Sequence, residues 1–217
     1  MKVYFLSGLG ADKTVFQLLD LSFCEPVFID WIKPLPDEQL QQYALRIKKE
    51  CIPADDAVIV GLSFGGMLAT EIATYYPNTR SIIISSSKTK NEIPALYRAG
   101  KYFPLYKWLP GKLQKTFMRF YEKRFGVRSK TGKKIYQNVI KQADISFNRW
   151  AIHALLYWDN MEVPANIVHV HGTADKILPY KNITCNYTIQ NGGHLMVMEN
   201  AREISAILQE LIVQYKS

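Results

Sequence analysis

The sequence is poor in cysteine and contains no long apolar run. Its three cysteines, Cys24, Cys51 and Cys185, are an odd number without the spacing of metal ligands. This pattern argues against a disulfide scaffold or a zinc module and favours reduced thiols in a cytoplasmic protein. No apolar stretch approaches the ~18 residues that cross a bilayer, and the first one, residues 3–6, stops at Ser7. We therefore expect neither a signal peptide nor a membrane anchor.

Biased tracts, internal repeats and linker-like stretches are also missing. The 217 residues are 48% hydrophobic and 21% charged, close to the averages of globular proteins. Disorder, collagen and coiled coil are therefore not expected. A chain of this length is typical of one compact domain with at most a small subdomain.

Acidic residues are scarce in one segment only. The chain has 27 Lys and Arg against 19 Asp and Glu, a net charge of +8. Residues 88–149 hold sixteen of these bases and three of the acids, so the rest of the chain is mildly acidic. We interpret most of these bases as solvated faces of amphipathic helices. The segment has neither an RNA-binding aromatic motif nor a recognition-helix signature, so no specific nucleic-acid partner is expected.

Short apolar runs alternate with helical patterns along the chain. The runs cover residues 3–6, 26–29, 57–60, 81–84 and 167–170, and a weaker sixth covers 184–189. This alternation is typical of an α/β protein with a mostly parallel sheet of about six strands and helices on both faces. One helix is expected over residues 40–51, after the helix start at residues 36–38. The last helix is expected to begin with Asn200 and Glu203 as a capping pair.

About eighty residues separate the fourth run from the fifth, although a crossover of a dozen or so would suffice. We therefore predict a core of residues 1–87 and 160–217 and a helical cap, residues 88–159, inserted in it. The aromatic residues of the cap are expected mainly to form its own small core. They are Tyr97, Tyr102, Phe103, Tyr106, Trp108, Phe117, Phe120, Tyr121, Phe125, Tyr136, Phe147 and Trp150.

The sharpest local signal is the G-x-S-x-G motif around Ser63, between an apolar strand and a helical pattern. A serine raised above a sheet on a tight strand-to-helix turn needs neighbours without side chains, which Gly61 and Gly65 provide. A glycine-bracketed turn with an ordinary surface serine is the alternative, but the strand before it and the helix after it favour a nucleophile.

A serine nucleophile needs a base, and the base needs an acid. His194 lies in a glycine-rich loop just before the last helix and is our candidate base. Asp175 follows the fifth apolar run and is our candidate acid, with Asp159 in reserve. The chain order Ser63, Asp175, His194 is the order expected for this constellation on an α/β sheet.

The other three histidines have simpler interpretations. His169 alternates with apolar residues in a strand and is expected to be packed in the core. His171 ends that strand before a tight turn, and His153, on an apolar helical stretch, is either core or pocket lining.

Two backbone N–H groups are expected to stabilise an oxyanion. They belong to Phe64, which follows the nucleophile, and to Leu9 in the loop after the first strand, with Gly10 as second choice. The same loop could suggest a dinucleotide site, but Gly8-Leu9-Gly10 lacks the third glycine of that motif.

Four blocks together resemble the α/β-hydrolase superfamily, in particular its small serine members with a helical cap. They are residues 5–10 (FLSGLG), 61–66 (GLSFGG), 171–175 (HGTAD) with Pro179, and 192–194 (GGH). The resemblance implies an α/β-hydrolase-like fold with Ser63, Asp175 and His194 as the catalytic triad and residues 88–159 as a variable cap over an acyl pocket.

The sequence departs from this family at two points. Ser7 stands where many relatives carry a histidine before the glycine, which puts the support of the oxyanion loop in doubt. The chain also begins at the strand that carries this loop, so we expect six parallel strands without the two that commonly precede it.

These features predict a serine hydrolase of the carboxylesterase or thioesterase type, with no metal and no organic cofactor. A lyase or a carbon-carbon bond hydrolase could use the same triad. The serine argues against epoxide hydrolase or dehalogenase chemistry, which uses an aspartate at this position in relatives of the fold. A noncatalytic module that binds anionic surfaces through the basic cap is the alternative of a different class.

The expected partner is a small ester or thioester with an apolar or anionic part. Lys88, Lys90, Arg98 and Lys101 are the bases that could attract a carboxylate, a phosphate or CoA. Peripheral membrane contact through Lys and aromatic side chains is a further alternative. The sequence does not determine the natural substrate, the acyl length or the oligomeric state.

Overall fold

The core of the protein is a six-stranded, all-parallel sheet. The computed structural model describes residues 1–104, 106, 108 and 110–215. The strands lie in the order β2-β1-β3-β4-β5-β6, and every neighbouring pair is parallel. Their bounds are β1 Lys2–Leu6, β2 Glu25–Phe28, β3 Val58–Leu62, β4 Arg80–Ile84, β5 Ile167–Gly172 and β6 Tyr187–Ile189.

The strands follow the predicted apolar runs because both faces of the sheet are covered. All five residues of β3, at the centre of the sheet, are buried. The sixth strand is shorter than expected. Asn186 explains its late start, since the Asn186 side chain accepts a hydrogen bond from the His169 backbone N–H. The Asn186 backbone N–H also donates to the His169 carbonyl at 2.8 Å, so one backbone bond and one side-chain bond join Asn186 to β5.

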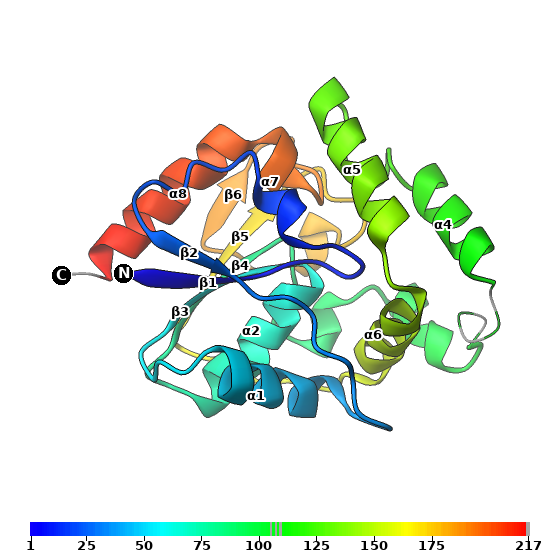
Figure 1. Ribbon diagram of the computed structural model, residues 1–217, viewed down its shortest axis with the longest axis horizontal. Helices are drawn as coiled ribbons and strands as arrows, with labels where there is room; N and C mark the ends of the chain where they lie inside the picture. The colour runs from blue at the N-terminus through cyan, green and yellow to red at the C-terminus, as the bar shows by residue number, and fades with distance from the viewer. Residues whose placement is uncertain (105, 107, 109, 216–217) are drawn as a thin grey trace.

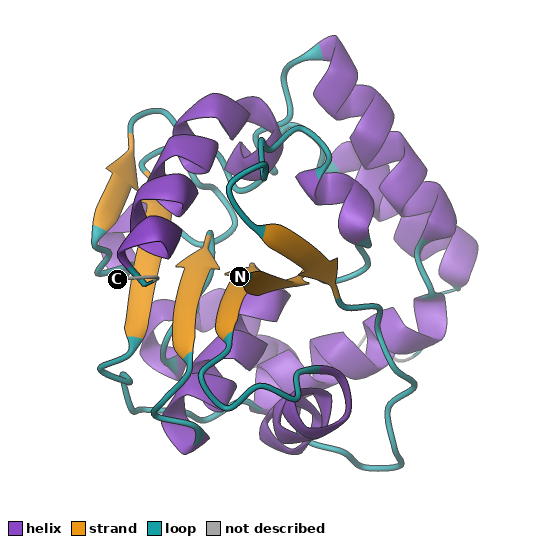
Figure 2. Ribbon diagram, turned by 60° about the vertical axis from the view of Figure 1, so that its left-hand side comes forward, coloured by secondary structure: helices purple, strands orange, loops and turns teal. Residues whose placement is uncertain are grey.

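Helices cover the sheet on two sides (Figures 1 and 2). One face packs against α1 (Leu40–Cys51) and α2 (Phe64–Tyr75), with a core that includes Tyr43, Ile59 and Leu68. The opposite face packs against α7 (Met196–Glu199), α8 (Ala201–Gln214) and the 3-10 helix η1 (Lys13–Phe16). Shorter 3-10 turns are η2 Lys90–Glu92, η3 Ala99–Lys101 and η5 Tyr180–Asn182. No helix among the described residues has the length and apolar character to cross a membrane.

The predicted helix over residues 40–51 is confirmed, but its start differs in detail. Its first turn is capped by Gln39, whose backbone N–H donates to the Gln42 side chain at 2.9 Å. The predicted capping pair of the last helix is wrong. The Asn200 side chain makes no capping bond, because α7 runs directly into α8 and the Asn200 N–H already donates to the Met196 carbonyl.

Between β4 and β5 the chain forms a set of helices at one end of the sheet (Figure 1). They are α3 Ala95–Arg98, α4 Gly111–Phe120, α5 Lys130–Gln142 and α6 Ile145–Tyr157. Helix α6 packs on the core through Trp150, whose ring lies 4.4 Å from that of Tyr43. Helix α5 lies beside η1, and α4 packs on α5. The helices therefore form one layer over the core.

The expectation that the aromatic residues of the cap form its own core is only partly correct. Tyr136 and Phe147 are buried. Tyr102, Phe103, Trp108 and Phe120 are 71–83% exposed. A single layer of helices has an outer face that nothing in the described chain covers, so these side chains remain at the surface.

A buried carboxylate joins the cap to the core. Glu71 on α2 is 3% exposed and accepts a hydrogen bond from the Trp158 indole N–H, just after α6. Burial is the main cause that raises the pKa of Glu71, and the negative charges of Asp159 and Glu162 add to it. Bonds from Trp158 and Gln41 oppose the shift without cancelling it.

Glu71→Gln should therefore change how stability depends on pH. The pKa of Glu71 is higher in the folded protein than in the unfolded chain, so the folded state binds more protons at this residue and the contribution of Glu71 to stability falls as pH rises above about 4.5. Glutamine does not titrate, so the variant should gain stability relative to wild type between pH 4 and pH 8. Urea unfolding across that range measures the difference, with exposed Glu203→Gln as the control. A constant difference would contradict the prediction.

Candidate active site

Ser63 sits on the sharp turn between β3 and α2. Its backbone has φ 51° and ψ −115°, a conformation that costs free energy for any residue other than glycine. Several bonds hold this turn. The Ser63 N–H donates to the Ile84 carbonyl, and the Ser63 carbonyl accepts from the Gly66 and Met67 N–H groups and from the Ser86 hydroxyl. The serine hydroxyl is thereby raised above the end of β3.

Glycines make this turn possible, as the motif predicts. A Cβ atom on Gly61 would collide with the Gly65 carbonyl, and one on Gly65 would collide with the carbonyls of Leu6 and Ser7. The close approach brings the start of α2 against the loop after β1. Glycine is therefore required at both positions.

The structure brings Ser63, His194 and Asp175 together. The distance from Ser63 Oγ to His194 Nε2 is 2.8 Å, and His194 Nδ1 lies 2.8 Å from Asp175 Oδ2. Because a carboxylate can only accept, Nδ1 carries the proton of the neutral ring and Nε2 is left to accept from the serine hydroxyl. This arrangement can withdraw a proton from Ser63 when its oxygen attacks an electrophile.

Asp175 is held as a carboxylate inside the protein. The residue is 5% exposed, and its Oδ1 accepts from the backbone N–H groups of Ile177 and Leu178 at 2.8 and 2.9 Å. Burial alone would raise the pKa of Asp175. The charge and hydrogen bond of His194, together with the Leu178 N–H, outweigh burial, so the pKa of the carboxyl is lowered.

A pair of buried histidines lies behind Asp175. The Leu178 carbonyl can only accept, so His171 Nε2 donates to it at 2.8 Å, and His171 Nδ1 accepts from His169 Nε2 at 3.2 Å. Burial lowers the pKa of both rings, most strongly that of His169. His169 is fully buried, as the sequence predicted. His171 does more than precede a turn, because its bond to Leu178 holds the loop that positions Asp175.

The loop of His194 rests on a segment of the cap that the sequence analysis missed. The Leu195 N–H donates to the Phe125 carbonyl at 3.0 Å, and the Phe125 and His194 rings lie 5.5 Å apart. Gly126 has φ +81°, and a Cβ placed there would lie 2.8 Å from Gly193 Cα. The glycines at 126 and 193 were the only sequence signal for this contact, and they are far apart along the chain.

The two predicted oxyanion donors, Phe64 and Leu9, line the same cavity as Ser63. The N–H groups of Gly65, Gly66 and Met67 all have backbone acceptors, whereas that of Phe64 has none in the described part of the chain. The Leu9 N–H likewise lacks a backbone acceptor among the described residues. Their role stays a prediction.

Ser7 supports the loop after β1. Its hydroxyl donates to the Ala11 carbonyl at 2.7 Å, and the indole N–H of Trp31 donates to the same carbonyl at 2.9 Å. A small hydroxyl therefore closes the loop that carries Leu9.

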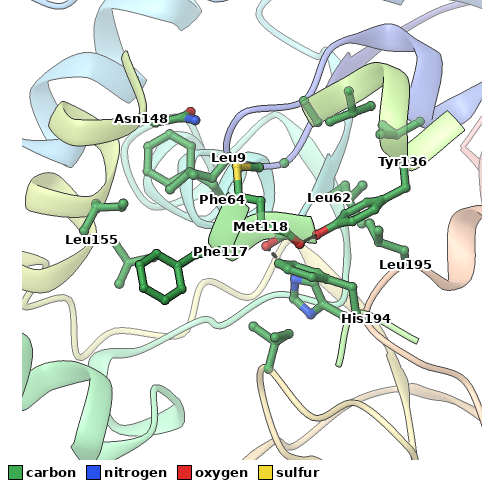
Figure 3. A pocket seen from close by; sticks show the side chains of 18 of the residues that line it. Leu9, Leu62, Phe64, Phe117, Met118, Tyr136, Asn148, Leu155, His194 and Leu195 are labelled. Carbon is green, nitrogen blue, oxygen red and sulfur yellow. Dashed lines mark hydrogen bonds between the residues drawn. The ribbon is translucent and has the colours of Figure 1, made fainter. Parts of the chain in front are cut away.

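A cavity of about 350 Å³ opens beside Ser63 and His194 (Figure 3). It is bounded by the loop after β1, the start of α2, the cap helices α4, α5 and α6, and the loop of His194. Most of its lining is apolar: Leu9, Ala11, Val15, Leu62, Phe64, Phe117, Met118, Phe125, Val139, Ile152, Leu155, Ile177, Leu195 and Met198. Such a lining favours an apolar group next to the serine.

The bases suggested for an anionic group do not line this cavity. Lys88 is buried, donates to the Thr184 carbonyl and lies near Glu92. Lys90, Arg98 and Lys101 border a separate hollow on the cap. The expectation that these four residues attract an anion to the serine is therefore not supported by their positions.

The remaining sequence candidates lie elsewhere. Asp159, the reserve acid, is exposed and borders another hollow with Glu71, away from His194. His153 borders that same hollow, and its Nδ1 lies 2.6 Å from the Tyr106 hydroxyl. Within the described residues, no three His, Cys, Asp or Glu side chains are grouped so that they could hold a metal ion.

Comparison with solved structures agrees with this architecture. A thermophilic esterase from Thermogutta terrifontis matches with a TM-score of 0.74 at 18% identity, over 100% of this chain and 91% of that one. A carboxylesterase structure from Nitrososphaera gargenis matches with a TM-score of 0.74 at 16% identity, over 99% and 90%. Bacillus megaterium epoxide hydrolase matches with a TM-score of 0.72 at 12% identity, over 97% and 93%.

These matches define the fold. No family model and no curated protein sequence matches the chain. The parallel six-stranded sheet, the helices on both faces, the inserted cap helices and the full-length superpositions together establish the α/β-hydrolase fold. At identities of 12–18% these structural neighbours support the fold and nothing more.

The hydrogen bond between His194 and Asp175 can be observed directly. A neutral imidazole that donates from Nδ1 to a buried carboxylate should give a proton NMR resonance far downfield of the amide region. Asp175→Asn should abolish this resonance, whereas Asp159→Asn should leave it in place because Asp159 does not contact the ring. Survival of the resonance in Asp175→Asn would contradict the geometry.

Proposed function

We propose that the protein is a serine hydrolase that cleaves a carboxylic ester or thioester through an acyl-enzyme intermediate. The observation that carries this proposal is the continuous chain of hydrogen bonds from Ser63 through His194 to Asp175 beside an apolar cavity. Each group has the partner that its role requires. The serine has a base, the base has an acid, and the acid has backbone donors.

In the first half of the reaction, Ser63 Oγ attacks the carbonyl carbon while His194 Nε2 takes the hydroxyl proton. The carbonyl oxygen becomes negatively charged and accepts hydrogen bonds from the Phe64 and Leu9 N–H groups. Asp175 stabilises the imidazolium, and its lowered pKa keeps it ionised for this task. The leaving alcohol or thiol then takes the proton from Nε2, and the acyl group stays on Ser63.

In the second half, water repeats the attack. His194 Nε2 takes a proton from the water as its oxygen bonds to the acyl carbon, and the proton passes to Ser63 Oγ as the ester bond breaks. The carboxylic acid leaves, and Ser63 and His194 return to their starting states. The cavity supports an apolar acyl group, because its lining offers few polar partners next to the serine.

Serine at the turn also separates this proposal from other chemistry on the same fold. An epoxide hydrolase is among the structural neighbours. An aspartate at the position of Ser63 would support that reaction, and here the position carries a hydroxyl. A lyase or a carbon-carbon bond hydrolase could use the same triad, and a panel of substrates tells them apart.

Removal of the triad tests the proposal. Ser63→Ala and His194→Ala should each lower kcat for p-nitrophenyl ester hydrolysis by roughly 10⁴- to 10⁶-fold, and the double variant should be no worse than either. Asp175→Asn should cost roughly 10⁴-fold, because the ring loses its orientation. A fluorophosphonate probe should label wild type and Asp159→Asn but not Ser63→Ala. A wild-type protein that resists labelling and cleaves no ester or thioester would overturn the proposal.

Exposed apolar side chains of the cap favour a second property, contact with an anionic lipid surface. Leu96, Tyr102, Phe103, Trp108 and Phe120 are each more than 70% exposed on α3, η3, α4 and their connection. Basic residues are interleaved with them at Lys101, Lys112, Lys115, Arg119 and Lys123. Exposed aromatic rings next to cations fit the interface of an anionic membrane, where rings enter the headgroup region and cations meet phosphates.

Vesicle binding tests this surface. Wild type should bind phosphatidylserine-containing vesicles more strongly than pure phosphatidylcholine vesicles, and less at high salt. Trp108→Ala with Phe120→Ala should weaken binding by at least about tenfold, because two apolar side chains lose their burial in lipid. Leu35→Ala with Val213→Ala removes exposed apolar residues outside the cap and should have no effect. Equal loss of vesicle binding in both double variants would exclude a specific cap surface. If Ser63→Ala binds vesicles as wild type does, and the fluorophosphonate probe does not label wild type, the noncatalytic module would be favoured.

A further inference from the structure

The cavity beside Ser63 contains four polar side chains besides the serine and histidine: Tyr106, Gln114, Tyr136 and Asn148. The Tyr106 hydroxyl pairs with His153 Nδ1 at 2.6 Å. The Tyr136 hydroxyl donates to the Met118 carbonyl at 2.7 Å. Gln114 is engaged in a further interaction. The two tyrosine hydroxyls therefore have protein partners, and Gln114 is not free.

Asn148 differs from them. It lies on α6, is only 2% exposed, and its amide oxygen Oδ1 is buried without a hydrogen-bond partner among the described residues. A buried amide acceptor without a partner destabilises the folded protein, so a bound hydrogen-bond donor would stabilise it. Its neighbours Phe147 and Trp150 are packed against Tyr43, so α6 fixes the backbone of Asn148 against the core.

The amide lies against the loop that carries the predicted oxyanion donor. A Cβ atom on Gly10 would be 3.0 Å from both Oδ1 and Nδ2 of Asn148, and Gly10 has φ +72°. A side chain at position 10 would therefore fill the space that the amide occupies. Gly8, at the start of the same loop, faces Ser63 Cβ, so the loop spans the distance from the nucleophile to Asn148. Figure 3 has Asn148 and His194 on opposite sides of the cavity.

We infer that Asn148 recognises a hydrogen-bond donor on the acyl group of the substrate, so that the protein prefers esters or thioesters of hydroxyacyl groups over plain alkanoyl groups. This inference rests on the proposed function. The rest of the cavity holds the alkyl part of the acyl chain by burial. The amide touches Gly10, next to Leu9 in the loop after β1, so we place the donor on the part of the acyl chain that would lie against this loop. A hydroxyl on the third carbon of the acyl chain is such a donor.

The donor satisfies the amide in a way that an alkyl chain cannot. An alkanoyl group leaves Oδ1 unpaired, whereas a hydroxyl donates to it after a small rotation about the last side-chain bond, which is soft in asparagine. A site built to bond a substrate hydroxyl discriminates strongly against the analogue without it. A methyl ether at the same carbon keeps the oxygen but cannot donate. Comparing it with the hydroxyl therefore separates the effect of the hydrogen-bond donor from the effect of a polar oxygen.

The test compares p-nitrophenyl esters of hexanoic, 3-hydroxyhexanoic and 3-methoxyhexanoic acid. Wild type should show a kcat/KM for the hydroxy ester at least about tenfold above that for the methoxy ester. Asn148→Leu, which keeps the volume and removes the amide, should bring this ratio close to one while it still cleaves the hexanoate ester. Asn138→Leu makes the same chemical change on the exposed face of α5 and should keep the wild-type ratio.

Two results would overturn the inference. An unchanged hydroxy-to-methoxy ratio in Asn148→Leu would mean that the amide does not bind the donor. An equal loss of activity on all three esters would mean that Asn148 only supports the Gly10 loop. In both cases hexanoate hydrolysis and fluorophosphonate labelling of wild type would still support the serine hydrolase, so the two proposals fail separately. A reduced unfolding temperature in Asn148→Leu would not imitate the expected result, because loss of folded protein lowers all three rates alike.

Discussion

The backbone of Ser63 is the constraint on which the rest of the site depends. A residue with a side chain is held at φ 51° because β3 and α2 must meet at a turn too tight for ordinary geometry. This turn is possible only where Gly61 and Gly65 let the backbone of α2 touch the end of β1. The same contact sets the loop after β1 beside the serine. One close approach thus determines both where the hydroxyl stands and which N–H groups surround it.

The base must then be held at this turn from a position far along the chain. His194 belongs to a short loop before α7, and that loop is fixed from two directions. Asp175 binds the ring from the side of β5, while the Phe125 carbonyl holds the Leu195 N–H from the cap. The cap is therefore more than a cover over the cavity beside Ser63. Because it touches the loop of the base, a movement of the segment around Gly126 would also move the imidazole.

Most of what could be predicted from the sequence follows from short local motifs. The strands, the serine turn and the chain order of the three polar residues each follow from short motifs, so Ser63, Asp175 and His194 were found before the structure brought them together. The contact of Phe125 with His194 depends on how the cap docks, and no short pattern records that. The same holds for the Asn148 amide oxygen, which has no partner in the described part of the chain. The exposed aromatic residues were misjudged for the same reason, because helical spacing does not tell which face of a single layer meets the core.

The groups packed around Asp175 keep the negative charge of the site on its carboxylate. Asp175 supplies the only carboxylate among the three residues. Its Oδ1 accepts hydrogen bonds from two backbone N–H groups, and its Oδ2 faces His194. His171 lies 3.6 Å from that second oxygen, and a protonated ring there would compete for it. Burial keeps the pKa of His171 low, and its proton on Nε2 is committed to the Leu178 carbonyl. The neutral pair of His171 and His169 therefore fills the space behind Asp175 without a second cation, and the full attraction of Asp175 remains for the His194 ring when it takes the Ser63 proton in the proposed reaction.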